Sequence, residues 1–237
     1  MRIELHIPAC PGTVPATALR LGGLTPLTTI DFPGRLAAVL YCQGCPWRCS
    51  YCHNPELLPA DTPAQLSWSD ALGFLQQRLG LLDGVVFSGG EPTLQAALPA
   101  ALQACRELGL QTGLHTGGMY LPRLVTALPL LDWVGLDIKA LPARYPFLTA
   151  TPASGSKPWE ALDWLLASGI DHEVRTTWHA GLFDVEELLQ LARALSDRGV
   201  QQWALQECRS ADAPLWTLQD EQLAELNTLF ARFTLRR

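Results

Sequence analysis

The stretch LAAVLYCQGCPWRCSYC (36–52) leads from an apolar, β-rich segment straight into four cysteines. The segment before the cysteines has the composition of a buried strand. The thiols of Cys42, Cys45, Cys49 and Cys52 then follow within eleven residues. Three kinds of site fit such a group: a disulfide staple, a closed zinc or ferredoxin-like site, or a metal cluster that three thiols hold and that keeps one position open for chemistry.

The composition shows no need for disulfides. With 237 residues, of which 48% are hydrophobic and 17% charged, the chain can form one large α/β core. The seven cysteines are an odd count, and the N-terminal sequence lacks the basic and apolar regions of a signal peptide. We therefore expect a reducing, cytoplasmic setting.

Neither a membrane nor a nucleic acid is expected as a partner. No apolar run is long enough to span a bilayer, because Pro129, Asp132 and Asp137 interrupt the longest candidates. The net charge is −6, and the sequence has no stripe of Lys and Arg that would bind phosphate backbones.

Apolar, β-rich segments alternate with segments of helical periodicity. One predicted helix is capped by Asp184, has Glu187 three residues later and ends at Gly199, while another follows Pro99 and ends at Gly109. Repeated βα units predict a parallel sheet, which is doubly wound or curled into a full or partial barrel. The predicted strands cover residues 36–42, 84–90, 111–118, 133–139, 172–179 and 200–208.

Polar and glycine-rich motifs follow each predicted strand. The cysteines follow the first strand, and the later strands end in SGGEP (88–92), TGG (116–118), DIK (137–139), RTTWH (175–179) and LQEC (205–208). Because the carboxyl ends of parallel strands share one rim of the sheet, we expect these motifs to meet there and to form the functional site.

The spacing from Cys45 onward is CxxxCxxC, with the aromatic Tyr51 just before the last thiol. This pattern resembles the signature of the radical S-adenosylmethionine (SAM) enzymes. The resemblance implies that Cys45, Cys49 and Cys52 hold three irons of a [4Fe-4S] cluster, and that the fourth iron stays open for the amino and carboxylate groups of SAM.

The closed sites fit less well. The gap of three residues between the two CxxC pairs is much shorter than the usual spacer between pairs of zinc ligands, and a ferredoxin orders its gaps differently. Cys105 lies on the apolar stripe of a predicted helix and is expected to be a packed core thiol. No role is assigned to Cys10 or Cys208.

Longer motifs narrow the resemblance to the glycyl-radical-enzyme activases, and among them to the activating protein of anaerobic ribonucleoside-triphosphate reductase. The resemblance begins near Leu21 and implies an α/β fold, a parallel partial (β/α)6 barrel of the radical SAM type over residues 21–237, after an N-terminal extension over residues 1–20. The motifs that carry it are TTIDFPG (28–34), CQGCPWRC (42–49), CHNPEL (52–57), FSGGEPTLQ (87–95), DIKA (137–140), HEVRTTWH (172–179) and LQECR (205–209).

This family resemblance implies a reaction and its partners. A flavodoxin or ferredoxin would supply an electron, and SAM would be cleaved to methionine and a 5′-deoxyadenosyl radical. That radical would take a hydrogen atom from a glycine of a partner enzyme, here the anaerobic reductase. The alternative is a radical SAM enzyme that acts on a small molecule, as the 7-carboxy-7-deazaguanine synthases do.

The resemblance also assigns SAM contacts by position. Trp47 and Tyr51 would shield the cluster, and His53 with Asn54 would help to order its loop. The expected SAM contacts comprise a glycine-rich turn for the amino end, polar and charged residues of three strands, and a histidine for the ribose or adenine: Gly89, Gly90, Glu91, Thr116, Asp137, Lys139, Arg175 and His179.

Two features depart from the activase pattern or extend beyond it. Many activases have an acidic residue, which helps to hold a monovalent cation, where this chain has His115; Gly117 and Gly118 replace a common Asn-Gly pair. Residues 141–158 form a proline-rich segment that we expect to be a long loop, acting as a lid over SAM or as a docking surface.

Overall fold

The computed structural model describes residues 14–209, 213–214 and 216–236. The predicted N-terminal extension lies outside the described residues up to residue 13, and Cys10 lies outside them as well. No helix of the described residues is long and apolar enough to cross a membrane.

The fold is built on one eight-stranded sheet whose strands follow one another in sequence order. All neighbouring strands are parallel except the first two, which are antiparallel. The strands are β1 (Leu21–Thr28), β2 (Ala37–Cys42), β3 (Gly84–Gly89), β4 (Gln111–Thr116), β5 (Trp133–Asp137), β6 (Asp171–Trp178), β7 (Gln202–Glu207) and β8 (Arg232–Arg236). The six predicted strands correspond to β2–β7.

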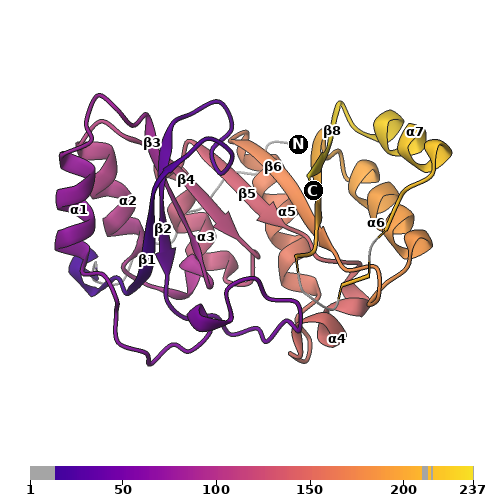
Figure 1. Cartoon of the computed structure of the whole chain (residues 1–237), viewed down its shortest axis with the longest axis horizontal. Helices are drawn as coiled ribbons and strands as arrows, with labels where there is room; N and C mark the ends of the chain where they lie inside the picture. Colours follow the sequence, from indigo (N-terminus) through magenta and orange to yellow (C-terminus); the bar gives the residue numbers. More distant parts are fainter. Residues whose placement is uncertain (1–13, 210–212, 215, 237) are drawn as a thin grey trace.

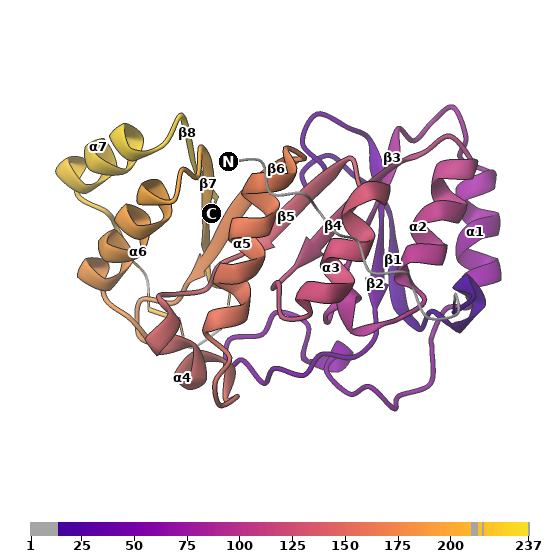
Figure 2. The ribbon, with the colours of Figure 1, turned by 180° about the vertical axis from the view of Figure 1, so that it is seen from behind.

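Helices cover one face of this sheet. The helices are α1 (Trp68–Gln76), α2 (Leu98–Glu107), α3 (Leu121–Ala127), α4 (Tyr145–Thr149), α5 (Ser156–Ser168), α6 (Val185–Asp197) and α7 (Asp220–Leu229). Figure 1 shows the sheet from its uncovered face, and Figure 2 shows α1, α2, α3 and α5 lying over the opposite face. In the described part of the chain β1 and β8 do not pair, so the sheet stays open as a partial barrel, and the predicted fold class is confirmed.

The two helices with the strongest sequence signals form as predicted. At the start of α6, Asp184 Oδ1 accepts a hydrogen bond from the Glu187 backbone N–H at 2.9 Å, and Glu187 Oε2 accepts one from the Asp184 N–H at 3.3 Å. This reciprocal cap satisfies two backbone donors that the helix itself cannot pair. Cys105 is fully buried on the inner side of α2, so the prediction of a core thiol is confirmed.

The connection between β1 and β2 folds across the uncovered face of the sheet. Phe32 from this connection packs with Ala37, Val86 and Trp133 in a separate small core, and its ring lies 5.8 Å from the ring of Trp133. Apolar packing therefore fills the face near the amino ends of the parallel strands, and the carboxyl ends are left for polar groups.

Residues 141–158 are not the long loop that we expected. They contain a 3-10 turn at Pro142–Arg144, the helix α4 and the start of α5. The backbone N–H of Arg48 donates to Thr149 O at 2.9 Å, and the rings of Trp47 and Tyr145 meet edge to face at 5.7 Å. Residues 141–158 therefore pack against the cysteine loop, which comprises residues 43–58.

Candidate functional site

A cavity of about 350 Å³ lies at the carboxyl ends of the parallel strands. All of the predicted site residues except His179 line it, so the motifs that are separated in sequence meet at one rim. Those lining residues are Cys45, Cys49, Cys52, Gly89, Gly90, Glu91, Thr116, Asp137, Lys139 and Arg175. The size is typical of a cavity for a cofactor or small ligand.

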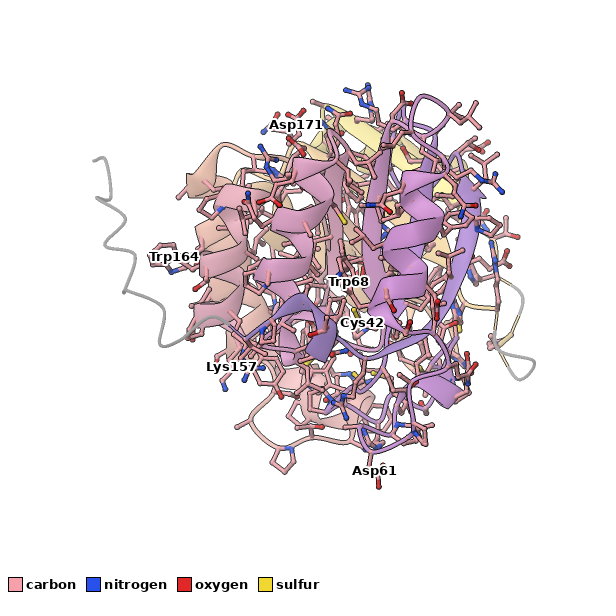
Figure 3. All side chains as sticks on the ribbon, turned by 90° about the vertical axis from the view of Figure 1, so that its left-hand side faces the viewer. Cys42, Asp61, Trp68, Lys157, Trp164 and Asp171 are labelled. Atoms are coloured by element: carbon pink, nitrogen blue, oxygen red, sulfur yellow. The ribbon has the colours of Figure 1, made fainter. Side chains whose placement is uncertain are left out.

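Three of the four clustered thiols face the cavity, and the fourth does not. Cys45, Cys49 and Cys52 are partly buried along its wall, whereas Cys42 is fully buried in β2 between β1 and β3. Figure 3 labels Cys42 in the middle of the molecule and Asp61 at its lower end, on the loop that follows β2. The cavity therefore has three thiols to offer as ligands.

The three thiols are ligands of the kind that iron–sulfur clusters use. Among the described residues, no three His, Cys, Asp or Glu side chains lie close enough together to hold one metal ion. In an iron–sulfur cluster each thiolate binds its own iron, so the sulfur atoms stand apart. Burial raises the pKa of Cys45 to about 12 and also raises that of Cys49, so metal binding must displace protons from these thiols.

The cysteine loop is held by its own backbone and by Arg48. Arg48 Nη1 donates to the carbonyl oxygens of Cys45 at 2.6 Å and Trp47 at 2.9 Å. The backbone N–H of Cys45 donates to Leu58 O at 3.0 Å, and that of Cys52 donates to Cys49 O at 3.2 Å. These bonds fix the turn that directs the three thiols inward.

The glycine pair at the end of β3 is explained by packing within the protein. A Cβ atom on Gly89, whose φ is +105°, would lie 2.6 Å from the backbone nitrogen of Cys42. A Cβ atom on Gly90 would lie 2.4 Å from the carbonyl oxygen of Gly44. Glycine is therefore required here for β3 to approach the cysteine loop, whether or not its backbone also approaches SAM.

Glu91 joins the ends of β3 and β4. Its buried carboxylate accepts hydrogen bonds from the Thr93 N–H at 3.0 Å, the Thr116 hydroxyl at 2.7 Å and the Gly117 N–H at 2.9 Å. Burial raises the pKa of Glu91, and these hydrogen bonds oppose that rise. The Glu91 carboxylate therefore already has hydrogen-bond partners within the protein, and the Thr116 hydroxyl is one of them.

Asp137 and Arg175 form an ion pair on neighbouring strands. Arg175 Nε and Nη2 donate to Asp137 Oδ1 at 3.0 and 2.9 Å. Burial alone would raise the pKa of Asp137, but the charges of Arg175 and Lys139 outweigh it and lower the pKa, so the carboxylate stays ionised.

Lys139 places its ammonium group beside the cysteine loop. Its Nζ lies 5.8 Å from the ring centroids of both Trp47 and Tyr51. Burial would lower the pKa of Lys139, but the nearby Cys49, Tyr51 and Asp137 groups more than reverse that effect and raise the pKa. The cavity therefore has a fixed positive charge next to its thiols.

His115 is a neutral ring at the position where the activase pattern has an acid. Its Nε2 lies 2.8 Å from the carbonyl oxygen of Asp31, which can only accept, so Nε2 carries the proton and Nδ1 accepts from the Ser88 hydroxyl at 3.2 Å. Burial and the charge of Arg175 lower the pKa of His115 to about 3. The side chain adds no negative charge that would attract a cation.

His179 is placed differently from the other predicted residues. It is buried, its ring centroid lies 6.2 Å from that of Tyr51, and its Nδ1 accepts the Gly181 N–H at 3.2 Å. It is not among the described residues that line the cavity. His179 therefore lies next to Tyr51, which lines the cavity.

Sequence reasoning missed several residues that line the cavity: Asp31, Tyr41, Ser88, Met119, Thr177, Gln206 and Arg209. Thr177 could have been found, because it stands two residues after Arg175 on a strand and therefore points to the same face. Asp31 comes from the distant connection between β1 and β2, and no periodicity in the sequence places it there.

Comparisons with known proteins agree with this geometry. The radical SAM superfamily model matches residues 39–195. A Methanocaldococcus jannaschii protein, named for glycyl-radical enzyme activation, is 28% identical over 204 residues, covering 81% of each chain. The pyruvate formate-lyase-activating enzyme of Clostridium pasteurianum is 35% identical over 125 residues, which span 51% of this chain and about half (52%) of that enzyme.

A solved structure shares the fold. Streptococcus suis SuiB bound to S-adenosylmethionine aligns with a TM-score of 0.60 and 14% identity over 85% of this chain and 46% of SuiB. The stretch that the superfamily model matches includes the three thiols of the cavity and the ends of the strands β2–β6 around them. Because that match extends over more than half of the sequence, we conclude that the chain belongs to the radical SAM superfamily.

Proposed function

We propose that this chain is a glycyl-radical-enzyme activase whose partner is an anaerobic ribonucleoside-triphosphate reductase. The observation that carries the proposal is a cavity that three thiols line, at the carboxyl ends of a sheet that stays open between β1 and β8. A closed barrel would admit only a small substrate, whereas an open edge lets a segment of a large partner reach the cofactors. Similarity to relatives named as activating enzymes supports the same kind of reaction.

Radical SAM enzymes use a [4Fe-4S] cluster and SAM, and the residues present fit both groups. Cys45, Cys49 and Cys52 would hold the cluster, because they are the soft ligands that face the cavity. The turn Gly89–Glu91, the ammonium group of Lys139 and the Asp137–Arg175 ion pair would hold the amino-acid end of SAM. When bound and reduced, the cluster supplies the electron that cleaves SAM to methionine and a 5′-deoxyadenosyl radical.

The protein has to position the groups and exclude water. The buried rings of Trp47 and Tyr51 cover the side of the cavity next to the thiols, and Lys139 keeps its positive charge between them. With SAM and the cluster bound, the site would allow a hydrogen atom to pass from the Cα of the partner's glycine to the 5′ carbon, which would give 5′-deoxyadenosine and leave the unpaired electron on the glycine. Exclusion of water by these rings would protect the 5′-deoxyadenosyl and glycyl radicals from side reactions.

The experiment uses the anaerobically reconstituted protein with a reductase encoded in the same genome. With SAM and either reduced flavodoxin or ferredoxin, we expect the glycyl doublet in the EPR spectrum only when the reductase is present. Control reactions omit SAM or replace the reductase by a variant whose radical glycine is changed to alanine. SAM cleavage without any doublet, together with turnover of a small molecule such as a 7-carboxy-7-deazaguanine precursor, would favour the alternative function.

A further inference from the structure

A row of polar side chains follows the wall of the cavity from β5 to β7, on the side of the edge strand β8. In the register of the sheet Asp137 pairs with Arg175, and Thr177 pairs with Gln206. Lys139 stands two residues beyond Asp137 and is therefore level with Thr177. Because paired residues of parallel strands share a face, Lys139, Thr177 and Gln206 follow one another along the wall, and all three line the cavity.

The two ends of this row have different surroundings. The charged groups of the strands that act on the pKa of Cys45 and Cys49 are Glu91, Asp137 and Lys139, at the ends of β3 and β5. Adjacent strands stand about 4.8 Å apart, so β7 lies roughly 10 Å from β5. Gln206 thus stands at the β7 end of the row, where its neighbour on the edge strand β8 is Arg236. The cysteine loop reaches this end as well, because the backbone N–H of Arg209 donates to His53 Nε2 at 3.1 Å.

The two arginines next to this row on β6 and β8 are already paired. Arg175 is bound to Asp137, and Arg236 holds both oxygens of Glu173 at 2.8 and 2.9 Å. By contrast, neither the hydroxyl of Thr177 nor the side-chain amide of Gln206 makes a hydrogen bond to another described residue. Both side chains are only partly buried and both line the cavity. They therefore present neutral donors and acceptors to a ligand.

We infer that Thr177 and Gln206 bind the main chain of the partner's glycine-bearing segment, an inference that rests on the proposed function. A side-chain amide offers an N–H donor and a carbonyl acceptor, and these are the groups that a peptide unit complements. An extended segment that enters at the open edge meets Gln206 first, then Thr177, and reaches the cofactor end at Lys139. The lack of a free acid in the row favours the neutral main chain over a basic side chain as its ligand.

The test uses a nine-residue peptide with the glycine-radical sequence of the reductase and an α-dideuterated glycine. The reconstituted, reduced holoenzyme and SAM are added, and deuterium is measured in the 5′-deoxyadenosine produced. We expect Thr177→Val and Gln206→Leu each to raise the peptide concentration for half-maximal transfer by about tenfold, as the loss of a hydrogen bond predicts. Gln202→Leu, a matched change at the exposed start of the same strand, should have no effect.

The outcomes separate this inference from the proposed function. If the variants match the unsubstituted enzyme, or if they raise the SAM requirement as much as the peptide requirement, the row does not recognise the peptide. Failure of the unsubstituted enzyme to use the peptide while it still activates the reductase would also overturn the inference, because main-chain recognition should operate without the rest of the partner. Failure with both substrates would instead overturn the proposed function.

Discussion

At the scale of single residues, the four clustered cysteines differ in their surroundings in the folded chain. Cys42 packs inside the sheet with no access to the cavity, and its pKa is raised first by burial and then by the charge of Glu91. Its neighbours Cys45, Cys49 and Cys52 face the cavity. The resemblance of the CxxxCxxC spacing predicts Cys45, Cys49 and Cys52 as the ligands, and the register of β2 places Cys42 inside the sheet, away from the cavity.

We predict that Cys42→Ala keeps both the [4Fe-4S] absorbance and reductive SAM cleavage. Alanine in place of a buried thiol leaves only a small cavity, which should cost about 1 kcal/mol of stability. Substitution of Cys45, Cys49 or Cys52 by alanine should abolish both signals, since a cluster with two protein ligands is incompletely held. Iron content and EPR spectra of the four variants after anaerobic reconstitution provide the measurement, and loss of the cluster in Cys42→Ala would contradict a three-thiol site.

His115 illustrates a second residue-scale effect, the energetic cost of protonating a buried ring. Its pKa is about 3 in the folded protein against 6.5 for an unperturbed histidine. As the pH falls below about 6.5, the unfolded chain takes up a proton at this residue before the folded chain does. The free energy of unfolding should therefore decrease by roughly 1.4 kcal/mol per pH unit until the pH reaches the folded value.

We predict that His115→Gln removes this contribution. Glutamine can still donate to the Asp31 carbonyl and accept from Ser88, but it does not titrate. Urea unfolding of both cluster-free proteins between pH 7 and pH 4 should show a shallower loss of stability in the variant. Parallel curves for the two proteins would mean that the ring is not buried as a neutral group.

At the scale of elements, the segment that follows β5 holds parts of the candidate site in place. The hydroxyl of the buried Tyr145 in α4 accepts the backbone N–H of Lys139 at 2.9 Å, and the Tyr145 ring packs on Trp47. The helix thus holds Lys139 and the cysteine loop together, although it contributes no side chain to the cavity among the described residues.

We predict that Tyr145→Phe lowers the free energy of unfolding by about 1–3 kcal/mol, because the Lys139 N–H loses its partner in a buried place. SAM affinity should fall as well, since the side chain of Lys139 loses its fixed anchor. Tyr120→Phe, at a more exposed tyrosine beside Arg123, is the matched control. An unchanged SAM dissociation constant in Tyr145→Phe would show that Lys139 is held in place without α4.

Whether a strand or helix could be predicted from the sequence depended on its surroundings in the fold. Strands β2–β7 are flanked on both sides, so their apolar runs are continuous and easily read. The edge strand β1 has the sequence LGGLTPLT, whose glycines and proline read as a turn, and it is a strand only because β2 pairs with it. The edge strand β8 is short and carries two arginines. Likewise, the prolines of residues 141–158 predicted a loop, so α4 was not predicted. This helix is stabilised by its packing on the cysteine loop.

At the scale of the whole molecule, the cysteine loop connects parts of the chain that are far apart in sequence. The backbone N–H of Gln43 donates to Arg20 O, next to β1, at 2.9 Å, and that of Arg48 donates to Thr149 O in α4 at 2.9 Å. At the other end of the sheet, the backbone N–H of Arg209 donates to His53 Nε2 at 3.1 Å. A group bound by three thiols of this loop would therefore stabilise both ends of the cavity rim at once.

We predict that loading the cluster slows amide hydrogen exchange well beyond the cysteine loop. The amides of Arg48 and Arg209 bridge the loop to α4 and to the end of β7, so both should exchange at least tenfold more slowly, by order of magnitude, in the loaded protein. Helices α6 and α7 should keep their exchange rates, because their capping and packing do not involve the loop. The measurement compares peptide-resolved exchange of the reconstituted protein with that of the same preparation after anaerobic chelation of its iron. Protection confined to residues 43–58 would show that the loop orders itself around the cluster without stabilising the rim, and the rim would then have to be fixed by SAM or by the partner.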